Sequence, residues 1–298
     1  MTPALETSKG YLGSALKQQY QDDGFLFPIQ AVSSEQAAAW RAELEDVEAK
    51  WLNNGLPKPL NQYRRSASHI VMPLAAEIAS HPAILNSMSG ILGDDLMIWS
   101  CEFFIKEANT THIVSWHQDL TYWGLGETSD QCTAWLALSP ATVASGCMNF
   151  VAGSHKNAIV PHTDTFDENN LLSRGQEIAV DADEDKATAI ELQPGQMSLH
   201  HGLTFHGSGP NTSDDRRIGV AIRYVNPNAM QQVADRDYAM LVRGADRSGN
   251  FINIARPADY FEPHALKMHD EVRNDKTSAL SAGLDSGTKM YTGSGKTL

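Results

Sequence analysis

In the first third of the chain, apolar residues recur at three- and four-residue steps, a spacing that predicts amphipathic helices. The clearest helix follows Ser33, because Ser33 and Gln36 form a capping-box pattern, and it ends before Gly55. Its apolar positions are Ala37, Trp40, Leu44, Val47 and Trp51. Further helices are predicted over residues 11–20, 73–80 and 82–92, and a brief strand over residues 24–28.

From residue 96 to residue 225 the pattern changes to short runs rich in β-branched and aromatic residues, separated by turn residues. Many short strands with such punctuation indicate a β-sandwich or barrel, so we predict a mainly β fold with flanking helices. The predicted strands are residues 96–105, 113–120, 132–138, 147–152, 177–180, 189–192, 196–201 and 217–225.

Residues 154–185 interrupt the β region with a polar, acidic stretch that has few core positions. Long connections inside a domain are usually functional lids or disordered, and we interpret this one as an insertion at the mouth of the barrel. We expect one domain over residues 1–298, with a helical part (10–93), a β core (95–226) and an extension (227–298). The extension contains a predicted helix over residues 263–272 and a loose end rich in Gly, Ser, Thr and Lys.

The composition is that of an ordinary globular protein, with 42% hydrophobic and 20% charged residues among 298. The formal net charge of −13 argues against binding to nucleic acid or to an anionic membrane surface. Cys101, Cys132 and Cys147 form no CxxC motif, and we expect them to be buried thiols in a reducing compartment. Since the chain offers neither a signal peptide nor an apolar run of membrane-spanning length, we expect a cytoplasmic protein.

The chemistry centres on His117 and Asp119 in a segment rich in strand-forming residues. Neighbours at i and i+2 of a strand point to the same face, so both side chains could bind one metal ion. His206, 89 residues further on, lies between Phe205 and Gly207 and is the best third ligand. Two His and one carboxylate form the facial triad of non-heme Fe(II) oxygenases. His200 and His201 compete for the third position, although one of them suits a supporting or substrate-binding role better.

Arg217 opens an apolar predicted strand 11 residues after His206. An Arg that points into a barrel needs an anionic partner, and its planar fork suits a carboxylate such as the distal one of 2-oxoglutarate, the cosubstrate of these oxygenases. The alternative is a strand-end Arg that is solvated or paired with Asp214 or Asp215, a description that fits the neighbouring Arg216 better.

Several ordered motifs between residues 20 and 226 resemble the phytanoyl-CoA dioxygenase family. They are Trp116-His117-Gln118-Asp119-Leu120-Thr121-Tyr122, Ala134-Trp135, Ser145-Gly146-Cys147-Met148, Gly153-Ser154-His155, His206-Gly207-Ser208-Gly209 and Arg217. The resemblance implies a double-stranded β-helix (a jelly roll, cupin-like) that binds Fe(II) and 2-oxoglutarate and uses O2.

By this analogy His117, Asp119 and His206 match the iron ligands, and Arg217 matches the residue that holds the distal carboxylate of 2-oxoglutarate. Ser208, Gln118 and Trp135 match positions that line the cosubstrate pocket. Related halogenases carry a small residue in place of the carboxylate, so Asp119 favours hydroxylation over halogenation.

Strand periodicity places Arg217, Gly219, Ala221 and Arg223 on one face. Arg223 could therefore bind an anionic group of the substrate, or it could pair with a core carboxylate such as Glu102. His69, after Arg64 and Arg65, could lean over the same opening, whereas Lys106 and Glu107 would be charges at its rim. The candidate walls of the pocket are Trp99, Phe103, Trp123 and Trp135.

We thus expect a dioxygenase that hydroxylates an unactivated C–H bond of a small anionic or zwitterionic metabolite and releases succinate and CO2. Three alternatives remain: an acyl-CoA hydroxylase of the same family, a zinc hydrolase with the same three ligands, and a non-catalytic jelly-roll binding protein. The sequence does not indicate the oligomeric state.

Overall fold

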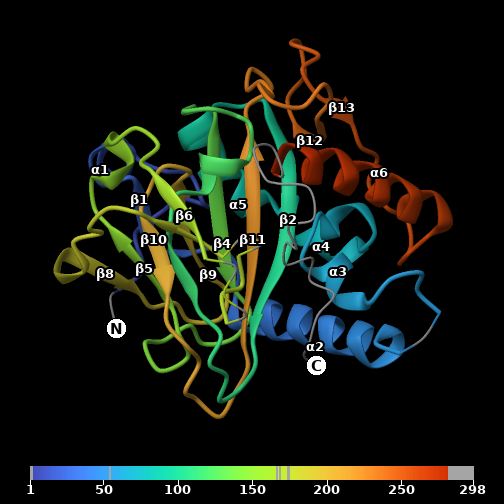
Figure 1. Ribbon diagram of the computed structural model, residues 1–298, viewed down its shortest axis with the longest axis horizontal. Helices are drawn as coiled ribbons and strands as arrows, with labels where there is room; N and C mark the ends of the chain where they lie inside the picture. Colours follow the sequence, from blue (N-terminus) through green and yellow to red (C-terminus); the bar gives the residue numbers. More distant parts are fainter. Residues whose placement is uncertain (1–2, 54, 166, 168, 173–174, 281–298) are drawn as a thin grey trace.

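The structure is a computed structural model that describes residues 3–53, 55–165, 167, 169–172 and 175–280 (Figure 1). Its first part is helical, as the apolar spacing predicts, and Ser33 caps α2 by accepting a hydrogen bond from the backbone N–H of Gln36 at 3.2 Å. The stretch between α2 and α4, where we predicted no helix, contains two more short helices. The elements are α1 (Ser14–Asp23), β1 (Phe25–Gln30), α2 (Ser34–Trp51), α3 (Leu60–Arg64), η1 (Ser68–Ile70), α4 (Pro73–Ala79) and α5 (Pro82–Leu92).

A seven-stranded sheet forms the centre of the molecule, with the strand order β1-β9-β4-β11-β2-β12-β13. Neighbouring strands run antiparallel except β12 and β13, and β11 pairs with β2 from Arg217 to Val225. Two of these strands, β12 and β13, were not predicted. The strands are β2 (Leu96–Lys106), β4 (Gln131–Ala137), β9 (Gln196–His201), β11 (Arg217–Val225), β12 (Tyr238–Arg243) and β13 (Ile252–Asn253).

A four-stranded sheet of order β3-β10-β5-β8 faces the larger sheet, as expected for a jelly roll. The strand predicted over residues 113–120 is shorter, since it ends at His117 and the 3-10 helix η2 (Asp119–Tyr122) follows. The short strand that carries His206 was not predicted. The strands are β3 (Val114–His117), β5 (Met148–Val151), β8 (Ala187–Ile190) and β10 (His206–Ser208).

The segment of residues 154–185 contains η3 (Ser154–Lys156) and a small antiparallel pair of strands, β6 (His162–Asp164) and β7 (Gln176–Ile178). η4 (Glu184–Lys186) connects this pair to β8. Hydrogen bonds tie the segment to the β3 region, because Asn170 donates to Ser115 at 2.9 Å and Tyr122 donates to Asp164 at 3.0 Å.

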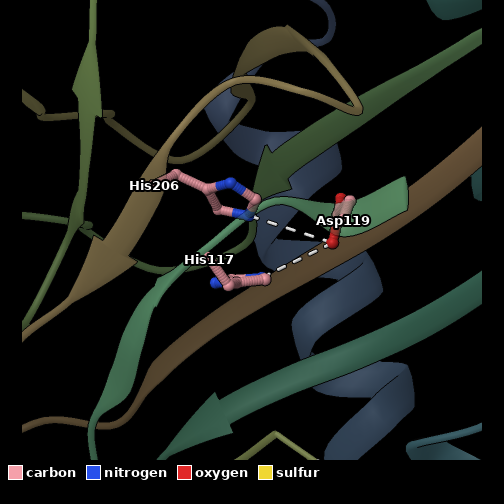
Figure 2. A group of neighbouring side chains, drawn as sticks. All are labelled: His117, Asp119 and His206. Atoms are coloured by element: carbon pink, nitrogen blue, oxygen red, sulfur yellow. Dashed lines mark ion pairs between the residues drawn. The ribbon is translucent and has the colours of Figure 1, made fainter. Parts of the chain in front are cut away.

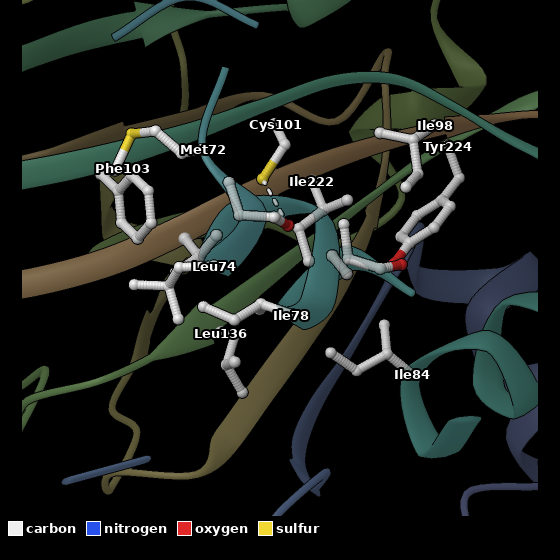
Figure 3. Close-up of a cluster of buried hydrophobic side chains, with 14 of the residues drawn as sticks. Met72, Leu74, Ile78, Ile84, Ile98, Cys101, Phe103, Leu136, Ile222 and Tyr224 are labelled. Carbon is white, nitrogen blue, oxygen red and sulfur yellow. Dashed lines mark hydrogen bonds between the residues drawn. The ribbon is translucent and has the colours of Figure 1, made fainter. Parts of the chain in front are cut away.

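The outer face of the larger sheet packs against α4 and α5, and α2, α3 and α6 lie on the same side, away from the smaller sheet, whereas α1 lies beside β1 (Figure 1). Figure 3 shows this core, in which the Tyr224 hydroxyl donates to the carbonyl of Ala79 at 2.6 Å. Phe103 belongs to this core and was wrongly expected as a wall of the pocket, because the strand alternation turns Phe104 and not Phe103 toward the smaller sheet. The core side chains labelled in Figure 3 are Met72, Leu74, Ile78, Ile84, Ile98, Cys101, Phe103, Leu136, Ile222 and Tyr224.

The C-terminal helix α6 (Pro263–Leu280) extends beyond the predicted residues 263–272 and packs against η1. The expected loose end lies outside the described residues. All three cysteines are free and buried, as predicted. Among the described residues, no helix has the length and apolar character needed to cross a membrane.

Candidate metal centre

His117, Asp119 and His206 converge between the two sheets, and their ligand atoms all lie within 4.8 Å of one another (Figure 2). The Oδ1 of Asp119 is 3.5 Å from Nε2 of His117 and 3.9 Å from Nε2 of His206. All three side chains are buried. Within the described part of the chain, this is the one group of His, Cys, Asp and Glu close enough to hold a metal ion.

Strand pairing brings the two His together, since His206 on β10 is the direct partner of His117 on β3. Our argument that His117 and Asp119 are i and i+2 neighbours on a strand was wrong in its premise. The strand ends at His117, and Asp119 starts η2, so the turn of the chain and not the strand pleat directs the carboxylate toward the imidazoles.

Both imidazoles are oriented by their own backbone. The Nδ1 of His117 lies 2.9 Å from the carbonyl of Ser115, and the Nδ1 of His206 lies 2.9 Å from the carbonyl of Thr204. Because a carbonyl only accepts, each Nδ1 carries the hydrogen and each Nε2 presents its lone pair to the centre. Burial lowers the pKa of His206 well below its usual value, which keeps the imidazole neutral and able to bind a metal.

Asp119 is held as a carboxylate. Burial alone would raise its pKa, but the side chains of His117 and His200, each 3.5 Å away, and the Arg223 guanidinium outweigh burial and lower the pKa well below its usual range. His200 and His201 competed with His206 for the position of the third ligand. Of these two, His200 supports the carboxylate, since its Nε2 lies 3.5 Å from Oδ2 of Asp119. His201 points away and its ring packs 5.5 Å from that of His155. The Thr133 hydroxyl also donates to Oδ2 of Asp119, at 3.4 Å.

The three ligands form one wall of a cavity with about 470 Å³ of space not filled by protein atoms, part of it open to solvent. Arg217, Ser208, Trp135 and Arg223, four of the predicted pocket residues, line the same cavity. The remaining lining residues are Phe104, Val114, Thr133, Met148, Leu172, His200, Gly207 and Ala221. Leu172 comes from the segment predicted to lie at the mouth of the barrel.

Arg217 points inward and is 1% exposed. Its Nη1 donates to the carbonyl of Gly146 at 2.6 Å, and the guanidinium lies 5.2 Å from the centre of the Trp135 ring. No carboxylate in the part of the chain that the structure describes forms an ion pair with it, and burial lowers its pKa to about 10. A buried guanidinium that lacks an acidic partner fits a ligand that brings its own carboxylate.

Arg216, unlike Arg217, pairs with carboxylates, as predicted, but its partners differ from the predicted ones. Instead of Asp214 or Asp215, its side chain pairs with Glu48 and Glu107, both at 2.8 Å. Asp215 pairs with Arg41 at 2.8 Å. These partners come from a helix and from the end of β2, so the local sequence could not identify them.

Lys106 was wrongly expected at the rim, because it is fully buried. It lies directly opposite Arg217 in the pairing of β2 with β11. Its Nζ donates to the hydroxyl of Ser208 at 2.7 Å and to the backbone carbonyls of Ser208 and Gly209. The alternation of β2 contains a signal for this residue, since Phe104 and Lys106 share one strand face and Phe104 lines the cavity.

Arg223 lines the cavity and also has the internal partner that we considered. Its Nη1 lies 2.5 Å from Oε2 of Glu102, and its guanidinium lies 4.7 Å from the centre of the Trp123 ring. Trp123 and Trp99, expected as walls, stack on each other at 5.0 Å beside the cavity and do not line it.

Two predicted pocket residues lie elsewhere. His69 does not lean over the opening, since it is fully buried and neighbours His269 and Lys276 of α6. Gln118 is buried next to the ligands, but its side-chain amide bonds to the backbone of Ala158, Val160 and Leu203 and does not line the cavity.

The donor set suits a non-heme metal site, because two imidazoles and a carboxylate line the same cavity. The same cavity is lined by the buried cation Arg217 and by the hydroxyl of Ser208. The arrangement can hold a metal ion and an anionic molecule next to each other.

The chain is similar to known proteins. The phytanoyl-CoA dioxygenase (PhyH) family matches residues 20–219 of the 298 residues. The probable phytanoyl-CoA dioxygenase of Caenorhabditis elegans is 26% identical over 170 residues, which are 54% of this chain and 54% of that protein. The chain thus spans about half the length of this relative.

Two solved structures share the fold. The apo form of the non-heme monooxygenase ThoJ is 34% identical, with a TM-score of 0.78 over 90% of this chain and 98% of that chain. CytC3 with Fe(II) and α-ketoglutarate has a TM-score of 0.61 over 86% of this chain and 98% of that chain. CytC3 is 20% identical, so its likeness concerns the fold alone.

Proposed function

The chain belongs to the phytanoyl-CoA dioxygenase family, and from this premise we propose that it is an Fe(II)- and 2-oxoglutarate-dependent dioxygenase. The observation that carries the proposal is a single cavity that contains both the three metal ligands and a buried Arg217 without a carboxylate partner among the described residues. Neither feature alone selects this class of enzyme, but their combination in one cavity does.

His117, Asp119 and His206 would hold the iron through Nε2, Oδ1 and Nε2. When bound, iron with 2-oxoglutarate and O2 supplies the oxidising chemistry that converts an unactivated C–H bond into an alcohol, with release of succinate and CO2. Arg217 binds the distal carboxylate of 2-oxoglutarate, and Ser208 and Trp135 line its pocket. The Asp119 carboxylate occupies the position that would have to be open for chloride, which favours hydroxylation.

The substrate we propose is a small anionic or zwitterionic metabolite. Arg223 supports an anionic group of the substrate, because its partly buried guanidinium lines the cavity, and it also pairs with Glu102. An acyl-CoA substrate is the second candidate within the family. The formal net charge of −13 makes a surface dedicated to the CoA phosphates less favourable.

Anaerobic titration of the metal-free protein with Fe(II) and 2-oxoglutarate tests the assignment through the visible charge-transfer band of the chelate. We expect a band in the wild type and none in Asp119→Ala. We also expect Arg217→Ala to need about 10- to 100-fold more 2-oxoglutarate, since a charged hydrogen-bonding partner is lost. Arg216→Ala is the matched control, because this neighbouring Arg pairs with Glu48 and Glu107 away from the cavity.

The alternatives predict other outcomes. A folded wild type that binds zinc tightly and shows no band would contradict the oxygenase and favour a zinc hydrolase. A band without succinate release, across a panel of small zwitterions, carboxylates and acyl-CoA esters, would favour a non-catalytic binding protein. The substrate proposal fails if acyl-CoA esters release succinate and zwitterions and small carboxylates do not.

A further inference from the structure

Two basic side chains lie opposite each other on paired strands, and one of them, Arg217, lines the cavity. Lys106 on β2 is the direct cross-strand partner of Arg217 on β11, and both are almost completely buried. Like charges at directly opposed positions normally destabilise a sheet, and buried charges are costly without partners. In the described part of the chain, neither residue pairs with a carboxylate. Such an arrangement requires a reason beyond folding.

The contacts of Lys106 show that it does not reach the cavity itself. An ammonium has three donors, and here three acceptors use them: the carbonyls of Ser208 and Gly209 and the hydroxyl oxygen of Ser208 at 2.7 Å. Lys106 is accordingly not among the residues that line the cavity, whereas Ser208 is. Any influence of Lys106 on a ligand passes through Ser208.

The bond to Ser208 fixes the direction of the hydroxyl. A lysine ammonium can only donate, so the Ser208 oxygen must accept, and its hydrogen is free to be donated to another group. Ser208 and Arg217 line the same cavity, so one carboxylate bound there can accept from both side chains. Hydrogen bonds from a hydroxyl that is already polarised by a cation are stronger than those of an isolated hydroxyl.

We propose that Lys106 is a positioning residue for the cosubstrate: it commits the Ser208 hydroxyl to donate to the carboxylate that Arg217 binds. This inference rests on the proposed function, since 2-oxoglutarate supplies that carboxylate. It also explains the opposed cations, because a bound carboxylate offsets the repulsion between Lys106 and Arg217. Burial, followed by the nearby Arg217, lowers the pKa of Lys106 to about 6 in the protein without a bound anion. A carboxylate beside Arg217 favours the ammonium form of Lys106, in which the Ser208 oxygen accepts.

A purely structural role is the alternative. In that case the bonds from Lys106 to the two carbonyls would stabilise the turn after β10, and its bond to the Ser208 hydroxyl would not affect ligand binding. A double-mutant cycle separates the two roles, because only the positioning role couples Lys106 to Ser208 in the affinity for 2-oxoglutarate.

The experiment uses Lys106→Met, Ser208→Ala and the double variant, each loaded anaerobically with Fe(II) and titrated with 2-oxoglutarate through the charge-transfer band. We expect each single variant to raise the Kd for 2-oxoglutarate about tenfold, and the double variant to raise it no further than the worse single one. Fe(II) affinity should stay within about twofold of the wild type, because the three ligands are untouched. Lys58→Met, which removes an ion pair with Asp270, is the control for loss of a lysine.

Three outcomes would overturn the inference. One is a folded Lys106→Met with the wild-type Kd, and another is a double variant whose effects simply multiply. If Lys106→Met does not fold, Ser208→Ala decides alone, because an unchanged Kd in that variant means that the hydroxyl donates nothing to the ligand. Ser208→Thr, which keeps the hydroxyl, should retain the wild-type Kd. A wild type without a band would instead contradict the proposed function, and the inference would fall with it.

Discussion

Gly219 lies on β11 two residues from Arg217, and the space above it is occupied by the Trp135 indole. A Cβ at this position would come within 1.8 Å of Cζ2 of Trp135, far inside contact distance. The indole packs 5.2 Å from the Arg217 guanidinium, so the missing side chain of Gly219 permits the stacking that holds this Arg in place.

We therefore predict that Gly219→Ala displaces Trp135 and with it Arg217. Overpacking of this kind costs about 1–3 kcal/mol of unfolding free energy, and the Kd for 2-oxoglutarate should rise as well. Chemical denaturation and the charge-transfer titration measure the two effects. Gly209→Ala is the matched control, because a Cβ there meets nothing within 4 Å, and an equal loss in both variants would contradict the steric argument.

At the scale of elements, the pairing of β2 with β11 sorts the side chains of both strands. On β11, Arg217, Ala221 and Arg223 face the metal centre, while Ile222 and Tyr224 face the helices. The strand period of two produces this division, and one shifted residue in the register would exchange the two sets. The helices thus stabilise the outer face and leave the inner face to the site.

Helix α2 packs against α4, which contacts the outer face, and the first turn of α2 depends on Ser33. The Ser33 hydroxyl accepts from the Gln36 backbone N–H, which otherwise has no partner within the helix. Ser33→Ala should lower the free energy of unfolding by about 1 kcal/mol and leave the Kd for 2-oxoglutarate unchanged. Urea denaturation alongside the charge-transfer titration measures both quantities, and a changed Kd would show that α2 is coupled to the site.

At the scale of the whole molecule, buried histidines make stability depend on pH. Burial lowers the pKa of His69 to about 3 and that of His269 to about 4, whereas an unfolded His titrates near 6.5. Below pH 6.5 the unfolded chain therefore binds protons that the folded chain does not. Their contribution to stability is complete above pH 6.5 and is lost progressively as the pH falls toward the folded pKa values.

His69→Leu isolates this effect, because neither ring nitrogen of His69 has a hydrogen-bond partner in the described structure. We predict that the loss of unfolding free energy between pH 7 and pH 5 is smaller in the variant by about 2 kcal/mol. Urea denaturation at both pH values measures it. His264→Leu, at an exposed position on α6, should retain the wild-type pH dependence. If wild type and His69→Leu lost the same unfolding free energy between pH 7 and pH 5, a group other than His69 would control the pH dependence of stability.

The sequence by itself determined what depends on neighbours along the chain. Helical spacing located α2, α4 and α5, and the uninterrupted apolar run located β11 with Arg217 and Arg223 on one face. The candidate metal group was also accessible, since His117, Asp119 and His206 stand in motifs whose order resembles a known family. Periodicity and motif order can both be read along the chain, so they require no knowledge of the fold.

The tertiary structure decided what depends on which strands and helices meet. β10 has three residues, too few for a periodic signal, and it exists because β3 and β5 pair with it on both sides. The burial of Lys106 follows from its register against Arg217, and the internal position of His69 follows from the packing of α6. Contacts of this kind join residues far apart in the chain. Their energies depend on register and packing that no local pattern encodes.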